Sequence, residues 1–159
     1  MQARLLALQT AYLQLIARQE GVLDHRDETL DWERMHMASA ARLAYLMAQE
    51  RGADPDLAAC AAAIHDIGRV LTGLQAGHAE AGEQPARSFL QETGLFSAAE
   101  IDLLAAAVRN HSKKSETGHP IEEIVKDSDV VDCYQYGLPF AREEQRVRYE
   151  AWLSQRPGH

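Results

Sequence analysis

The sequence predicts an all-α protein, a compact single-domain bundle of about six or seven helices. Apolar residues recur at helical spacing along most of the chain, and glycines, prolines and capping residues separate the segments that carry them. No segment of useful length shows the alternation typical of a strand. With 159 residues, 46% of them hydrophobic, the chain has the size of one domain and can bury an adequate core. We therefore expect residues 1–159 to form a single domain.

The helices are predicted, in chain order, at about residues 2–20, 31–51, 55–68, 78–93, 98–111, 120–137 and 141–154. The first, second and fourth are each followed by a glycine that can adopt the left-handed conformation of a C-cap, namely Gly21, Gly52 and Gly94. The third and sixth open on Pro55 and Pro120, because proline is favoured at the first helical position. Together these signals place most of the helix ends.

Three further features concern the remaining helices. Pro85 marks either a kink or a new start within the fourth. Ser97 and Glu100 form a capping-box pattern at the start of the fifth. The last is amphipathic, with Val147 and Trp152 among charged residues. All seven segments therefore have a helical signal of their own.

Charge and composition restrict the function classes. A net charge of −8 argues against general nucleic-acid binding, which needs a basic surface, but a small phosphate ester remains acceptable. The longest apolar run, residues 57–64, is far shorter than the ~20 residues that span a bilayer, so no membrane association is expected. Cys60 and Cys133 are isolated and form no disulfide-like pattern, so a reducing, cytoplasmic location fits best.

Four residues suggest a metal site. His65 and Asp66 come at the end of a predicted helix, and His36 and Asp129 lie on the apolar faces of two others. An unpaired carboxylate there would cost several kcal/mol. A divalent cation bound by both imidazoles and both carboxylates removes that cost, because these groups are the ligands that such metals take. Taken alone, His36 could instead be a core histidine that is hydrogen-bonded and binds no metal.

The order His, then His-Asp, then a distant Asp resembles the HD-domain superfamily of metal-dependent phosphohydrolases. The string HDIGR at residues 65–69 is similar to the family's HD segment, and KDSDVVD at 126–132 is similar to its K-D-A-D-x-x-D segment, with Ser128 where Ala is usual. The string HAEAG at 78–82 is similar to an H-x-x-x-G element. The resemblance covers about residues 32–137. It implies an HD-domain-like fold and bound metal.

A second metal ion is a further expectation. His111 ends an apolar stripe and His78 starts a helix, so both side chains could face the same cavity. The resemblance implies two ions where extra histidines stand at such places. Asp66 would then bridge the ions and take part in catalysis, because two cations make the bridging water a better nucleophile. The alternative is that His78 and His111 contact substrate or cap their helices.

Basic residues near these ligands are candidates for phosphate recognition. Lys113 and Lys114 follow His111, and Arg69 follows the His-Asp pair, so each could neutralise phosphoryl oxygens. Solvated loop charges are the alternative. Some superfamily members place a glutamate near the position of Arg69, and its absence leaves Glu33 as one candidate for the general acid.

Three function hypotheses follow. The first is a phosphohydrolase that uses one or two divalent ions (Mn, Mg, Fe, Zn or similar) and metal-activated water on a small anionic phosphorylated compound, possibly a nucleotide. The second is a di-iron oxygenase, since some superfamily members share the ligand order His, His-Asp, His, His, Asp. The third is a non-catalytic, metal-stabilised module that binds a small molecule. Metal identity separates the first two, and turnover separates both from the third.

Overall fold

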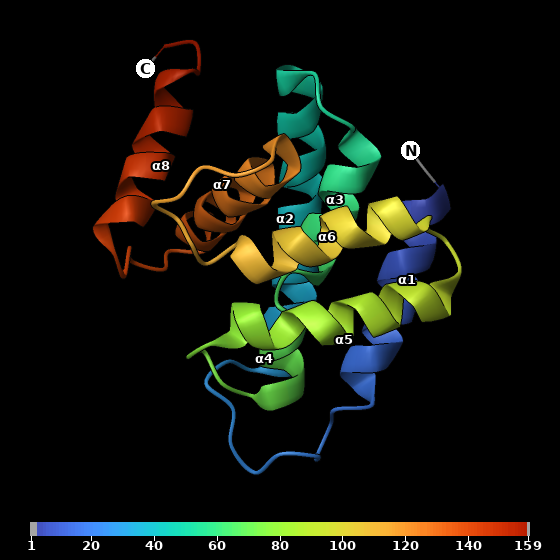
Figure 1. Cartoon of the computed structure of the whole chain (residues 1–159). Coiled ribbons are helices and arrows are strands. Elements are labelled where there is room, and N and C mark those ends of the chain that lie inside the picture. Colours follow the sequence, from blue (N-terminus) through green and yellow to red (C-terminus); the bar gives the residue numbers. More distant parts are fainter. Residues whose placement is uncertain (1–2, 159) are drawn as a thin grey trace.

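The computed structural model describes residues 3–158, in which eight helices and no strand are found. The helices are α1 (Ala3–Ala17), α2 (Leu30–Arg51), α3 (Pro55–Ile64), α4 (Ile67–Thr72), α5 (His78–Thr93), α6 (Ala98–Asn110), α7 (Pro120–Gln135) and α8 (Glu143–Ser154) (Figure 1). The all-α fold expected from the sequence is confirmed. The eighth helix arises because the helix expected over residues 55–68 is broken at His65-Asp66.

The core forms where α2, α3 and α7 pack against one another. The alanines of α3 are almost completely buried, and their small side chains let the neighbouring helices approach closely. Helices α5 and α6 lie side by side, and α6 also contacts α3 (Figure 1). Helix α1 contacts α3 and α2, and its residues Leu8, Tyr12 and Ile16 complete the apolar interior. None of the helices in residues 3–158 is long and apolar enough to cross a membrane.

Several helix ends agree with their sequence signals. Gly52 and Gly94 adopt left-handed conformations as C-caps of α2 and α5, and Ser97 and Glu100 form the expected capping box. Helix α5 runs without a break through Pro85. The first helix ends at Ala17, before the expected residue 20, because the chain changes there to tighter turns with i to i+3 hydrogen bonds.

The break between α3 and α4 gives the fold its most important local geometry. His65 is the C-cap of α3, and Asp66 leaves helical geometry with φ −94° and ψ 14° before α4 begins. Adjacent side chains of an unbroken helix diverge by ~100°. The break instead lets His65 and Asp66 face the same point, where the Nε2 and Oδ2 atoms are 3.2 Å apart.

Two glycines hold α4 against α5. A Cβ atom added at Gly68 would stand 1.9 Å from the backbone oxygen of His78 and 2.7 Å from the backbone nitrogen of Gly82. A Cβ atom added at Gly82 would in turn stand 3.1 Å from the backbone nitrogen of Gly68. The two backbones therefore touch, and this contact fixes the start of α5 beside the α3–α4 break.

Helix α8 packs beside α7 (Figure 1), and polar and aromatic contacts attach it to the bundle. Arg148 donates hydrogen bonds to the carbonyl oxygen of Lys114 at 2.6 Å and to Asp127 at 2.9 Å. The ring of Tyr134 on α7 lies 4.2 Å from that of Tyr149, measured between centroids. These contacts fix α8 beside α7 and beside the loop after α6.

We predict that Gly68→Ala destabilises the protein by about 3 kcal/mol or more, because rigid backbone cannot make room for the new methyl group. Gly52→Ala is the control. It introduces the same methyl group at φ 68° with no atom within 4 Å, so it should cost only about 1–2 kcal/mol of backbone strain. Urea denaturation measures both free energies of unfolding. A loss for Gly68→Ala no larger than that for Gly52→Ala would contradict the proposed contact.

Candidate metal centre

Six ligand-type side chains from five places in the bundle converge on one buried region. They are His36 of α2, His65 and Asp66 at the α3–α4 break, His78 at the start of α5, His111 at the end of α6, and Asp129 of α7. All are buried except Asp129, whose side chain is 17% exposed. The structure therefore brings together every residue that the sequence proposed as a metal ligand.

The first set contains His36, His65, Asp66 and Asp129. The Nε2 atom of His36 lies 3.2 Å from Nε2 of His65, 3.5 Å from Oδ2 of Asp66 and 3.1 Å from Oδ1 of Asp129. An ion with ligands at ~2.0–2.2 Å separates neighbouring ligand atoms by roughly 3.0–3.5 Å, so the spacing suits a single ion. Two imidazoles and two carboxylates also form a normal donor set for a divalent transition metal.

The second set contains Asp66, His78 and His111. The Oδ1 atom of Asp66 lies 3.0 Å from Nε2 of His78 and 3.4 Å from Nε2 of His111, and the two Nε2 atoms are 2.9 Å apart. Asp66 thus presents one carboxylate oxygen to each set. A carboxylate in this position is suited to bridging two cations.

Hydrogen bonds at Nδ1 orient all four imidazoles. Backbone carbonyl oxygens accept from Nδ1 of His65, His78 and His111 at 2.6–2.7 Å, and Oδ2 of Asp132 accepts from Nδ1 of His36 at 2.6 Å. These acceptors hold a proton on each Nδ1, so in the neutral ring it is the Nε2 atom that carries the lone pair and can bind a metal ion. Lone pairs and carboxylates that face one another in this way fit a bound cation.

The charges of the protein agree with this fit. Burial disfavours ionisation of Asp66, but Arg69 and His65 overcome it and hold the pKa of Asp66 well below its ordinary value. Burial also opposes protonation of His65, yet Asp66 and Asp129 raise the pKa of this imidazole to about 10. In the protein without an ion, the carboxylates are therefore ionised and attract positive charge.

Comparison with known proteins identifies the family. The model of the HD domain matches residues 34–137, a segment that contains all six side chains. The chain belongs to the HD-domain family. A hydrolase dependent on a divalent metal is the activity that this family supports.

The HD domain is also similar to part of several larger proteins. It is 32% identical over 115 residues to ribonuclease Y of Thermobifida fusca (strain YX), and 29% identical over 116 residues to ribonuclease Y of Aquifex aeolicus (strain VF5). Each alignment includes 72% of this chain. The chain spans only about a fifth of these relatives, 21% and 19% of their lengths.

A solved structure shares the fold. It is a crystal structure described as a predicted HD superfamily hydrolase from an uncultured Thermotogales bacterium, with a TM-score of 0.56 and 22% sequence identity. The likeness covers 95% of this chain and 86% of the other. It therefore extends beyond the family match to almost the whole bundle.

The six ligands together form what we call the HD centre. Residues around it hold the ligands in place, and three of these residues were not identified from the sequence as supports. Asp132 accepts from His36 and also from Oγ of Ser39, at 2.7 Å. Lys114 donates to Oδ2 of Asp129 at 2.6 Å. Arg69 donates to Oδ2 of Asp66 at 2.5 Å. Asp132 could have been found because it follows Asp129 by three residues and so shares its helical face.

The three basic residues expected to contact phosphate lie in different surroundings. Arg69 is buried, and Glu33 pairs with it at 2.7 Å, which places this glutamate in an ion pair. Lys114 is buried and contacts Asp129, and Lys113 is half-buried in the loop after α6. Phosphate recognition by Lys113, Lys114 and Arg69 stays a prediction, but the observed contacts of Lys114 and Arg69 are with ligand carboxylates.

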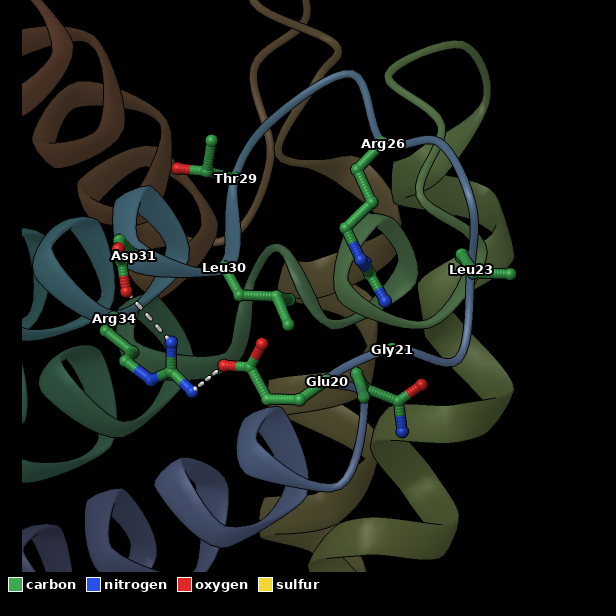
Figure 2. A pocket seen from close by; sticks show the side chains of 9 residues that line it. Glu20, Gly21, Leu23, Arg26, Thr29, Leu30, Asp31 and Arg34 are labelled. Atoms are coloured by element: carbon green, nitrogen blue, oxygen red, sulfur yellow. Dashed lines mark hydrogen bonds and ion pairs between the residues drawn. The ribbon is translucent and has the colours of Figure 1, made fainter.

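Two hollows each have one of the six ligands in their lining. One, of about 20 Å³, is lined by Asp129 and Cys133, and the other, of about 240 Å³, is lined by His78. A third hollow, of about 280 Å³, lies between the end of α1 and the start of α2 and contains none of the six ligands. Figure 2 shows that Arg34 in this hollow is bridged to Asp31 and Glu20. Arg26 also lines this hollow and donates a hydrogen bond to the carbonyl oxygen of Val70 at 2.7 Å. The hollow is separate from the six ligands.

Removal of Asp66 should affect both ligand sets. We predict that Asp66→Ala abolishes binding of both metal equivalents, whereas His78→Ala removes only one, because His78 belongs to the second set alone. Asp127→Ala is the control, since Asp127 on α7 pairs with Arg51 and Arg148 and lies outside both sets. Elemental analysis of protein saturated with manganese measures the stoichiometry. If Asp66→Ala still binds two equivalents of manganese, Asp66 does not serve as a ligand shared by the two sets.

The hydrogen bond from Asp132 to His36 should set metal affinity. We predict that Asp132→Ala weakens binding at the first set by roughly 10–100-fold, the usual effect of losing such an orienting partner. Ser39→Ala removes only a hydroxyl that donates to Asp132, so its effect should be smaller. Competition with a coloured chelator measures both affinities. Equal affinity of wild type and Asp132→Ala would show that His36 needs no orientation by Asp132.

Proposed function

We propose that this HD domain is a metal-dependent phosphohydrolase that acts on a small phosphorylated compound, possibly a nucleotide. The observation that carries the proposal is the position of Asp66, which gives one oxygen to each of two imidazole-containing sets. Divalent ions held there supply Lewis acidity, which lowers the pKa of water and neutralises phosphoryl oxygens. This is the chemistry that hydrolysis of a phosphoester needs.

The chain's own residues would hold this centre rigid. Arg69 and Lys114 neutralise part of the negative charge of Asp66 and Asp129 and fix the orientation of both carboxylates. The Nδ1 hydrogen bonds keep four imidazole rings from rotating. Because the ligands are held in place before substrate arrives, little reorganisation is needed during the reaction.

The relatives named ribonuclease Y favour phosphodiester chemistry at the shared HD segment. Their name gives RNA as the substrate of those proteins, and the present chain matches about a fifth of their length. The net charge of −8 is unsuited to a long RNA strand. We therefore favour a small phosphodiester or monoester, such as a nucleotide, as the substrate of this chain.

The second candidate is a di-iron oxygenase. The observation that favours it is that all six ligands of the order His, His-Asp, His, His, Asp are present and form overlapping groups of three whose ligand atoms lie within 4.8 Å of one another. Phosphohydrolase activity remains our preferred function because the family relatives with a stated activity act on a phosphoester.

A phosphoester screen tests this function. We expect manganese-loaded protein to hydrolyse at least one nucleotide, p-nitrophenyl phosphate or bis-p-nitrophenyl phosphate, and chelator to abolish the activity. Asp66→Ala, purified in parallel, should lower kcat at least ~100-fold and so exclude a contaminating phosphatase. Oxygen-dependent substrate loss in an iron-loaded protein without phosphatase activity would favour the oxygenase. Failure of both assays would leave a metal-stabilised binding module.

A further inference from the structure

The larger hollow at the HD centre lies between the start of α5 and the segment that leads into α8. We call it the α5–α8 pocket. Its lining includes His78, Ser112, Arg142 and Gln145, and its volume is about 240 Å³. His78 belongs to the second ligand set, and Ser112 directly follows His111 of that set. A ligand in this pocket would therefore contact His78, whose Nε2 atom lies 3.0 Å from Oδ1 of Asp66.

Three hydrogen bonds, two of them made by Arg142 itself, hold residues 141 and 142 at this pocket. Its Nη2 atom donates to the carbonyl oxygen of Ser112 at 2.9 Å. The side-chain oxygen of Gln145 accepts from the backbone nitrogens of Ala141 and Arg142 at 2.7 and 3.1 Å. The backbone at Arg142 is thus fixed, and its guanidinium group is tied to the loop that follows a metal ligand.

The guanidinium group of Arg142 differs from those of the arginines on α8 because it has no carboxylate partner among the described residues. Arg146 pairs with Glu143 and Glu150, and Arg148 pairs with Glu123 and Asp127. Within residues 3–158, no carboxylate lies within 4 Å of the guanidinium of Arg142, which is exposed. Its remaining N–H groups can therefore bind an anion, and a guanidinium matches phosphate oxygens in bidentate geometry.

We propose that Arg142 binds the phosphate group of the substrate in the α5–α8 pocket and positions it beside His78 and Asp66. The proposal rests on the proposed phosphohydrolase function and adds the residue that recognises the substrate. Glu80 also lines this pocket and is exposed. Because its carboxylate would repel a phosphate, the attraction must come from Arg142 and from the metal centre.

Binding of inorganic phosphate to the manganese-loaded protein tests this role without turnover. We expect Arg142→Gln to weaken phosphate affinity about 10–100-fold in calorimetric titration, the usual effect of losing a charged hydrogen bond. Arg146→Gln is the matched control, one helical turn away on α8, and should leave affinity unchanged. Glu80→Gln should strengthen binding, because it removes negative charge from the same pocket. In turnover assays Arg142→Gln should mainly raise KM.

The outcomes separate this inference from the proposed function. Wild-type affinity for phosphate in folded, metal-loaded Arg142→Gln would overturn the role of Arg142, even if the protein hydrolyses phosphoesters. Weakened phosphate binding in a protein that fails the phosphoester screen would support Arg142 and contradict the function. If Arg142→Gln does not fold, phenylglyoxal modification of wild type decides. Phosphate should protect Arg142 from modification, as mapped by mass spectrometry, and equal modification with and without phosphate would overturn the proposal.

Discussion

The structure depends on one carboxylate, that of Asp66, because it connects the two ligand sets and meets the buried guanidinium of Arg69. An ionised carboxylate this deeply buried costs several kcal/mol unless it is paired and hydrogen-bonded. Arg69 provides a permanent partner, and Glu33 balances the remaining charge of Arg69. The carboxylates of this network therefore favour the binding of a cation at the centre.

The backbone geometry that orients Asp66 explains why two of the sequence strings contain a glycine. The HDIGR string needs its glycine because α4 touches the backbone of His78, and the HAEAG string needs its glycine because α5 touches α4 at the same place. The two glycines are thus two sides of a single contact. This contact brings the second ligand set within reach of Asp66, so the spacing of the metal ligands depends on packing that carries no charge.

The sequence predicted what local patterns determine. Periodicity and capping residues predicted an all-α chain, and the apolar faces of His36 and Asp129 predicted that both point inward. Contacts between helices far apart in the chain were not predicted, because periodicity gives the face of a residue but not its partner. The contact of Lys114 with Asp129 was therefore not foreseen, and substrate binding by Lys114 stays a prediction. Arg142 was not considered because nothing in its local sequence places it beside Ser112.

Electron paramagnetic resonance of the wild-type protein saturated with manganese tests the central claim most directly. If Asp66 bridges the two sets, two manganese ions should bind about 3.5–4 Å apart and give the spectrum of a spin-coupled pair. A single bound equivalent, or two equivalents with the spectrum of isolated ions, would contradict a centre organised around one shared carboxylate.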